Sequence, residues 1–137
     1  MNDVVLNKRD SIARCIRQVH AYYRLTSEIP FEQDHLRQDA IAINLQRIVE
    51  MALDLANHLV RREKLGLPQD SAGAFALLHR AGLIPDETFH TLRGMIGFRN
   101  ILVHEYQRLD LSIMIEVIER RLEDCLAFAD LVVQRCR

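Results

Sequence analysis

Residues 41–59 read IAINLQRIVEMALDLANHL, and the spacing of their apolar side chains decides the fold class. Apolar residues recur at steps of four, three, four, three and four, at Ile41, Leu45, Ile48, Ala52, Leu55 and Leu59. That period places them on one stripe of an α-helix. We expect Asp34 to cap this helix and the helix to end at Arg62 or Glu63. A stripe of this length needs a facing helix, so the segment predicts an antiparallel bundle.

The rest of the chain also has helical periodicity. A first helix is expected from about Val5 to Glu28, ended by Ile29-Pro30 because the residue before proline is pushed out of the helical region. The further expected boundaries are Ser71 as the cap and Gly82 as the exit of a short helix, Pro85-Asp86 as the start of the next, and Asp110 or Ser112 as the start of the last. The sequence therefore predicts an all-α antiparallel helical bundle of four long helices and one short helix, in a single domain over residues 1–137.

The last helix has its own core stripe. Its expected members are Met114, Ile118, Leu122, Cys125, Ala129 and Val132.

Composition excludes several classes of protein. The formal net charge is −1, from 18 Lys and Arg against 19 Asp and Glu, which disfavours long-range attraction to nucleic acid but allows a local basic cleft. Cys15, Cys125 and Cys136 have no CxxC spacing, so we expect buried free thiols in a reducing compartment rather than disulfides or a zinc site. The N-terminal residues lack the apolar core of a signal peptide, and no apolar run approaches the ~20 residues of a membrane span. We expect a soluble cytoplasmic protein without a membrane partner.

Residues 99–106, RNILVHEY, mix polar groups into an apolar stretch. On a continuous helix Arg99, Val103 and Tyr106 share one line, and Asn100 and His104 share a second. The polar side chains could therefore border one concave face. The structural alternative is a hydrogen-bonded scaffold histidine, a half-buried tyrosine and an arginine that pairs with a neighbouring helix.

The partner of Arg99 in that alternative would be Glu50 or Asp54, which could equally support a cleft. Asp54 and His58 are one turn apart, but a metal site would need a further ligand from elsewhere, so we expect no metal and no cofactor. The run Arg61-Arg62-Glu63-Lys64 is typical of a solvated helix end and could also grip an RNA backbone.

Gly94 and Gly97 precede the polar cluster on the Asn100 line. Glycine inside a helix costs about 1 kcal/mol relative to alanine. The pair predicts close packing against the second helix or against a second subunit.

The motif Arg99-x4-His104-x-Tyr106, continued through Asn100, resembles the HEPN superfamily and, within it, the HepT toxin family. The resemblance covers the whole chain, because helix order, length and motif position agree. It implies a metal-independent endoribonuclease with Arg99 and His104 as the catalytic pair and Asn100 as a supporting residue. The RNA supplies the 2′-hydroxyl nucleophile, histidine moves protons and arginine steadies the phosphate.

The resemblance also implies partners. Similar proteins are homodimers whose two motifs face a shared cleft, which would supply a second Arg99 and His104. They act on RNA, with tRNA as the expected substrate, as toxins of toxin–antitoxin systems. An MNT-type minimal nucleotidyltransferase antitoxin would neutralise the toxin by transferring AMP from ATP to Tyr106.

Two alternatives stay open on the residues alone. One is a non-catalytic helical module that binds a nucleotide or a nucleotidyltransferase partner through the same cleft. The other is a purely structural dimerisation bundle.

Overall fold

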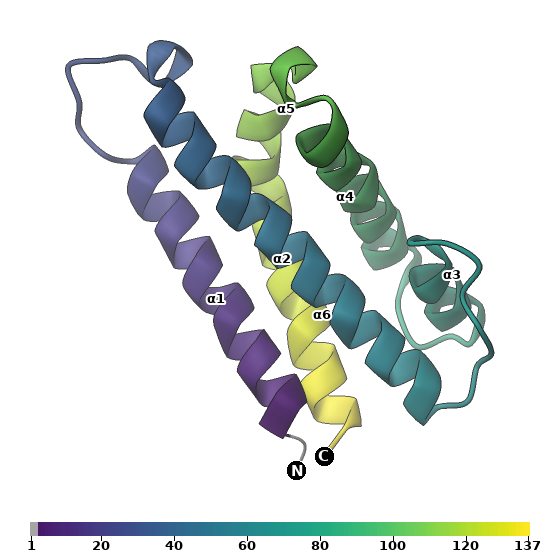
Figure 1. Ribbon diagram of the computed structural model, residues 1–137. Helices are drawn as coiled ribbons and strands as arrows, with labels where there is room; N and C mark the ends of the chain where they lie inside the picture. The colour runs from purple at the N-terminus through teal and green to yellow at the C-terminus, as the bar shows by residue number, and fades with distance from the viewer. Residues whose placement is uncertain (1–2) are drawn as a thin grey trace.

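The computed structural model describes residues 3–137, and all of its regular elements are helical (Figure 1). The longer helices are α1 (Asp3–Tyr23), α2 (His35–Arg62), α3 (Gly73–Arg80), α4 (Asp86–His104), α5 (Leu111–Glu116) and α6 (Leu122–Arg135). Short turns of 3₁₀ or π type are η1 (Phe31–Gln33), η2 (Tyr106–Arg108) and η3 (Val117–Arg121). α1, α2, α4 and the α5–α6 segment alternate in direction, which confirms the all-α antiparallel bundle. The expected domain spans residues 1–137, and its first two residues lie outside the described range.

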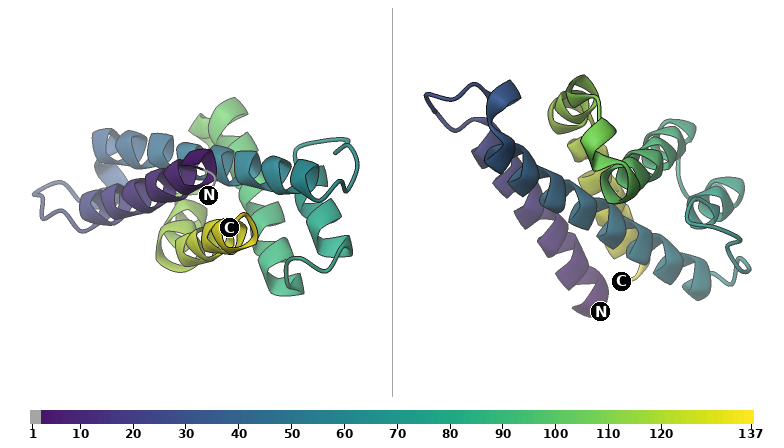
Figure 2. Two further views of the ribbon diagram at one scale, coloured as in Figure 1. Left: turned by 90° about the horizontal axis from the view of Figure 1, so that it is seen from below. Right: turned by 45° about the horizontal axis from the view of Figure 1, so that its top comes forward.

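The stripe on α2 is the centre of the core. All six of its predicted members are at most 1% exposed. α2 contacts α1, α3, α4 and α6, and Figure 2 shows α3 lying at the edge of the bundle, beside α2 and α4. The sequence prediction for this helix is confirmed at both ends, because Asp34 accepts a hydrogen bond from the Arg37 backbone N–H at 3.1 Å and the helix ends at Arg62.

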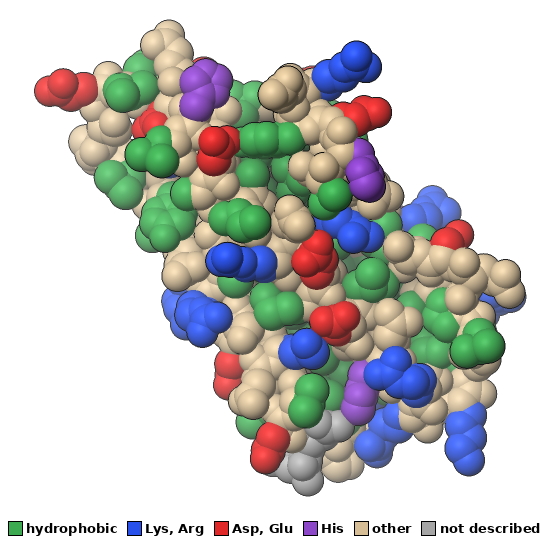
Figure 3. Space-filling model, viewed as in Figure 1, with side chains coloured by type: hydrophobic (Ala, Val, Ile, Leu, Met, Phe, Trp, Pro, Cys, Tyr) green, Lys and Arg blue, Asp and Glu red, His purple; other side chains and the backbone are tan. Residues whose placement is uncertain are grey.

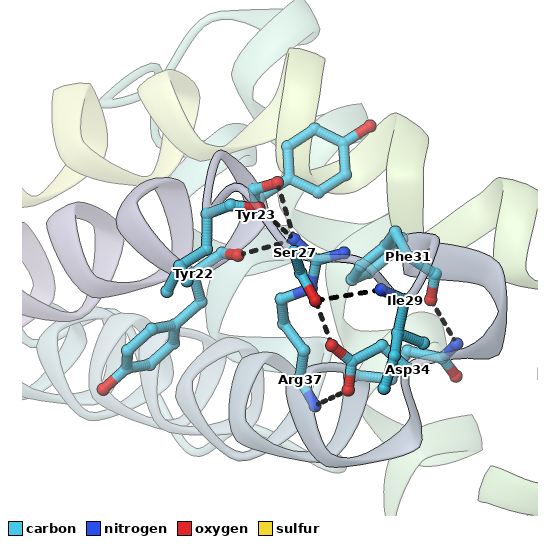
Figure 4. A network of polar contacts seen from close by, with 9 residues as sticks. Tyr22, Tyr23, Ser27, Ile29, Phe31, Asp34 and Arg37 are labelled. Atoms are coloured by element: carbon cyan, nitrogen blue, oxygen red, sulfur yellow. Dashed lines mark hydrogen bonds and ion pairs between the residues drawn. The ribbon is translucent and has the colours of Figure 1, made fainter.

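α1 ends at Tyr23, so the predicted end at Glu28 is wrong. The physical reason lies in α2: Arg37 Nη1 donates to the carbonyl oxygens of Leu25 at 2.8 Å and Tyr22 at 3.3 Å (Figure 4). The same guanidinium forms an ion pair with Asp34 at 3.3 Å. Carbonyls at a helix C-terminus lack partners within the helix, and the largely buried Arg37 guanidinium satisfies them here.

The predicted last helix is interrupted by the π-type turn η3. A π turn accommodates an extra residue, and the carbonyl it frees from the α-helical pattern needs another partner. His20 Nε2 lies 3.3 Å from the carbonyl oxygen of Ile118, and the Tyr23 hydroxyl donates to Glu119 at 2.8 Å. These contacts fix the turn against α1, and the predicted core stripe stays buried on both sides of it.

Three smaller expectations concern the two ends of α3 and the cysteines of α1 and α6. Ser71 does not cap α3, which begins at Gly73 with no side-chain cap. Gly82 ends the helix as predicted, with a φ of +75° and a hydrogen bond from the Leu83 N–H to the Leu78 carbonyl. The cysteines Cys15, Cys125 and Cys136 are buried and free, as predicted.

The glycine prediction fails within the protomer. A Cβ added at Gly94 or Gly97 would meet nothing within 4 Å, so neither glycine is required by packing against α2. Close approach of a second subunit stays a prediction.

The start of α1 lies beside the end of α6, away from the end of α4 (Figure 1). Arg9 Nε is 2.7 Å from Asp130 Oδ1, which joins the two helices at the surface. Within residues 3–137, no helix is both long and apolar enough to cross a membrane.

Replacing Arg37 with methionine should lower the free energy of unfolding by about 2–4 kcal/mol, because hydrogen bonds to charged groups contribute about 1.5–3 kcal/mol each. Arg9→Met is the matched control, since its exposed ion pair should contribute only about 0–1 kcal/mol. Urea unfolding followed by circular dichroism measures both. Equal losses for the two variants would show that the buried network contributes no more than a surface ion pair.

Candidate functional site

The C-terminal half of α4 carries the polar motif, and the helix ends inside it. His104 is the last helical residue, and Glu105 leaves the helix at φ −140° and ψ 34°. Tyr106 therefore lies on the separate turn η2. The expectation that Tyr106 shares a helix line with Arg99 is wrong, because the backbone changes direction between them.

Arg99 lies between α2 and the segment that precedes α3. Its side chain is 18% exposed, with Nη1 4.0 Å from Glu50 Oε1 and Nη2 donating to Ser71 Oγ at 3.4 Å. Its Nε is buried and has no hydrogen-bond partner. Both polar contacts are long, so the guanidinium keeps much of its capacity to donate hydrogen bonds.

Glu50 and Asp54 were the two acidic residues expected near Arg99, and the structure places one of them in contact with it. Glu50 is in contact with Arg99 and also accepts a hydrogen bond from Gln46 at 3.1 Å. Asp54 instead pairs with Lys8 of α1 at 3.1 Å, so of the two alternatives Glu50 is the one that contacts Arg99. Sequence reasoning missed Ser71 as a contact of Arg99, because its position before a short helix indicated only a cap.

Asn100 and His104 face solvent on the other side of α4. Both are exposed, and so are Gly94 and Gly97 on the same line. Val103 beside them is 45% exposed. A strip of α4 that includes the motif histidine is thus open and, at the two glycines, free of side chains.

Arg99 and His104 have different surroundings in the protomer. The arginine turns toward Ser71 and Glu50, whereas the histidine stands at the exposed end of the helix. They provide two groups with complementary chemistry, a permanent cation and an imidazole, on different sides of one helix, so the two side chains do not border one concave face within the protomer as expected.

Tyr106 contacts a residue that the sequence did not indicate. Its hydroxyl donates to Asp39 Oδ1 of α2 at 2.6 Å. Burial, followed by the hydrogen bond and charge of Asp39, raises the pKa of the Tyr106 phenol above its ordinary value. Both residues line a pocket of about 490 Å³. Asp39 is an exposed position 67 residues from Tyr106, so no local pattern pairs them.

The other candidate features are placed as follows. In the described chain no group of three or more His, Cys, Asp or Glu side chains is arranged to hold a metal ion.

His58 is partly buried. Burial lowers its pKa, and the positive charges of Arg61 and Arg62 lower it further. Figure 3 shows basic side chains gathered around the C-terminal end of α2, where the Arg61–Lys64 run is exposed. This end of α2 lies away from His104.

Comparison with known proteins gives consistent matches. A family model described as Ribonuclease HepT-like matches residues 12–132. The chain is 42% identical over 132 residues to the mRNA nuclease HepT of Shewanella oneidensis, covering 96% of this chain and 98% of that protein.

Solved structures agree with the sequence match. One is a tri-AMPylated Shewanella oneidensis HEPN toxin in complex with an MNT antitoxin, with a TM-score of 0.90 and 41% identity over 98% of this chain and 99% of that chain. Another is a toxin–antitoxin with AMP-PNP, with a TM-score of 0.90 and 40% identity over 97% and 99% of the two chains.

Arg99→Met and His104→Ala should each change the free energy of unfolding by less than about 1 kcal/mol, because one side chain has only long polar contacts and the other is exposed. Leu102→Ala, on the same helix but buried, should cost about 2–5 kcal/mol. Denaturant unfolding of the three variants tests this. A loss for Arg99→Met as large as that for Leu102→Ala would identify the arginine as a structural residue.

Proposed function

The chain belongs to the HepT-like ribonuclease family, and on this premise we propose that it is the RNA-cleaving toxin of a toxin–antitoxin pair, with Arg99 and His104 as its catalytic residues. The proposal rests on the surroundings of the Arg99 guanidinium. Its guanidinium is held by two long contacts and has an unpaired, buried Nε, on the helix that ends at the exposed His104.

The proposed reaction needs no metal. The 2′-hydroxyl of the RNA attacks the adjacent phosphorus, the 5′-oxygen leaves, and a 2′,3′-cyclic phosphate is formed. His104 moves the proton of the attacking or the leaving oxygen, because an imidazole nitrogen can either accept or donate a proton. Arg99 donates to the phosphoryl oxygens as negative charge develops, and Asn100 is exposed beside it as a supporting polar group. Glu50 orients Arg99 until the phosphate binds.

We propose that the active enzyme is a homodimer. One imidazole cannot readily serve as both base and acid on opposite sides of one phosphate, whereas two facing motifs supply both. The exposed strip of Gly94, Gly97, Asn100 and His104 supports this arrangement, since helix-interior glycines without neighbours in the protomer allow another backbone to come close.

The proposed substrate is RNA in the cytoplasm. A tRNA substrate follows from the family resemblance, while the Shewanella relative is named as an mRNA nuclease, so both classes belong in the assay. Glu50 and Arg61 are eleven residues apart, which is three turns plus about 20°, so they share one side of α2. The Arg61–Lys64 run therefore begins about 16 Å along the helix from Glu50, within reach of an extended RNA strand bound at Arg99.

We propose that the partner is an MNT-type nucleotidyltransferase that transfers AMP to Tyr106. The similar Shewanella toxin, which is tri-AMPylated and bound to an MNT antitoxin, supports this proposal. Tyr106 follows His104 by two residues and borders a pocket. An attached adenylate adds bulk and negative charge near the site for an RNA phosphate, so it opposes RNA binding.

Arg99→Met and His104→Ala should each lower the rate of RNA cleavage at least a hundredfold. The first removes the cation that stabilises the developing negative charge, and the second removes the group that transfers a proton. The assay uses separate tRNA and mRNA substrates and identifies the cyclic phosphate by mass spectrometry. Arg17→Met, an exposed arginine of α1, is the control that should cleave normally. Full cleavage by either motif variant contradicts the proposal, and RNA binding without cleavage by the wild type indicates a non-catalytic module.

The dimer is tested in the same assay with Gly97→Leu. This variant should lower both the dimer fraction in light scattering and the cleavage rate, without unfolding the protomer. A monomer that cleaves RNA at the wild-type rate would rule out the shared cleft.

Incubation with the partner nucleotidyltransferase and ATP should attach AMP to Tyr106 and abolish cleavage. Intact-mass analysis detects the adduct. Tyr106→Phe should stay unmodified and active, whereas Tyr22→Phe should be modified like the wild type. An unchanged wild-type mass, or an adduct on Tyr106→Phe, contradicts the assignment.

A further inference from the structure

Asp39 and Tyr106 form a short contact between α2 and the turn η2. The phenol donates to Asp39 Oδ1 at 2.6 Å, toward the short end of the range for such bonds. Asp39 is exposed, and Tyr106 is partly buried. The carboxylate is therefore not required to satisfy a buried group of the core.

The atom that carries the proton is also the atom that would react. Tyr106 is the proposed acceptor of AMP, and this inference rests on that proposed function. The phenol is neutral at physiological pH, because the ordinary pKa of tyrosine is already about 10 and the pKa of Tyr106 is raised above it, so no phenolate is ready to attack. A proton must leave Oη when the new bond forms, and Asp39 is the group in hydrogen-bond contact with it.

We propose that Asp39 accepts the Tyr106 proton during adenylyl transfer, so that the toxin supplies the general base for its own modification. Tyr106 Oη attacks the α-phosphorus of a nucleoside triphosphate held by the transferase. A new phosphorus–oxygen bond forms, the bond from the α-phosphorus to the bridging oxygen breaks, and pyrophosphate leaves. The phenol proton passes to Asp39 and then to water.

The pocket beside the pair gives the triphosphate room to approach. It has a volume of about 490 Å³ and is lined by Asp39 and Tyr106 with His35, Gln38, Gln107, Leu109, Leu111 and Met114. His35 is the other titratable group in this lining. The pocket lies at the start of α2, away from the Glu50 contact of Arg99.

A purely structural role for the contact makes a different prediction. A hydrogen bond that only holds the turn would be retained by an amide in place of the carboxylate, because the amide oxygen still accepts. A proton acceptor would not be replaced in that way. The pair Asp39→Asn and Asp39→Glu therefore separates the two roles.

The experiment measures the rate of AMP incorporation into full-length protein mixed with the partner transferase, Mg²⁺ and ATP, followed by intact mass. Asp39→Asn should be at least tenfold slower than wild type at pH 7, and Asp39→Glu should recover part of the rate. Glu28→Gln, an exposed carboxylate-to-amide change in the loop before α2, should react at the wild-type rate. The His35→Gln variant should keep the wild-type dependence of the rate on pH, and a pH profile like that expected for Asp39→Asn would identify His35 as the base and overturn the inference.

The pH profile provides the decisive measurement. The Asp39→Asn rate should rise about tenfold per pH unit above neutrality, because hydroxide must then remove the proton, while the wild-type rate changes less steeply. An Asp39→Asn variant with the wild-type rate or the wild-type pH profile overturns the inference and leaves the modification of Tyr106 intact. A wild-type protein that receives no AMP overturns the proposed modification and this inference with it.

Discussion

Burial of the apolar stripe on α2 is the constraint on which the rest of the molecule depends. α1, α3, α4 and α6 each pack against this one helix. Its solvent-facing side has a second role, because Asp39 and Glu50 are eleven residues apart and lie on one side of the helix. Glu50 contacts Arg99 and Asp39 contacts Tyr106. The helix that organises the core therefore also positions both parts of the motif.

Local patterns predicted the elements whose ends are set locally. The α2 stripe, its cap at Asp34 and the exit of α3 at Gly82 each depend on residues within one or two turns. The end of α1 could not be found in this way, because it depends on Arg37, which reaches back from the next helix. The π turn is visible in the sequence. The core residues Met114, Ile118 and Leu122 are separated by two successive steps of four, whereas steps of three and four alternate along the stripe of a regular α-helix.

In the functional site, too, local sequence patterns predicted some residues, whereas contacts with distant residues were not predicted. The motif named Arg99, Asn100, His104 and Tyr106, and Glu50 was recognised as a possible neighbour of Arg99. Arg99 contacts Ser71 and not Asp54, and Tyr106 contacts Asp39. Both contacts depend on how α2 packs against α4 and against the segment that precedes α3. Contacts of this kind, between residues far apart in the chain, leave no periodic pattern in a single sequence.

The near-neutral charge is compatible with phosphate binding at Arg99. An ion pair at 4.0 Å with a carboxylate that is 45% exposed contributes at most about 1 kcal/mol. A phosphate offers the guanidinium shorter, forked hydrogen bonds and can displace that carboxylate at small cost. Local geometry, rather than a large positive field, then governs the affinity of this position for an anion.

The adjacency of the start of α1 and the end of α6, joined by Arg9 and Asp130, has a practical consequence for protein engineering. A short peptide could connect the two ends while the chain is reopened at an exposed loop, giving a circular permutant with the same packed helices. Fluorescent or affinity fusions at either end would likewise project away from the far end of α4, where His104 lies.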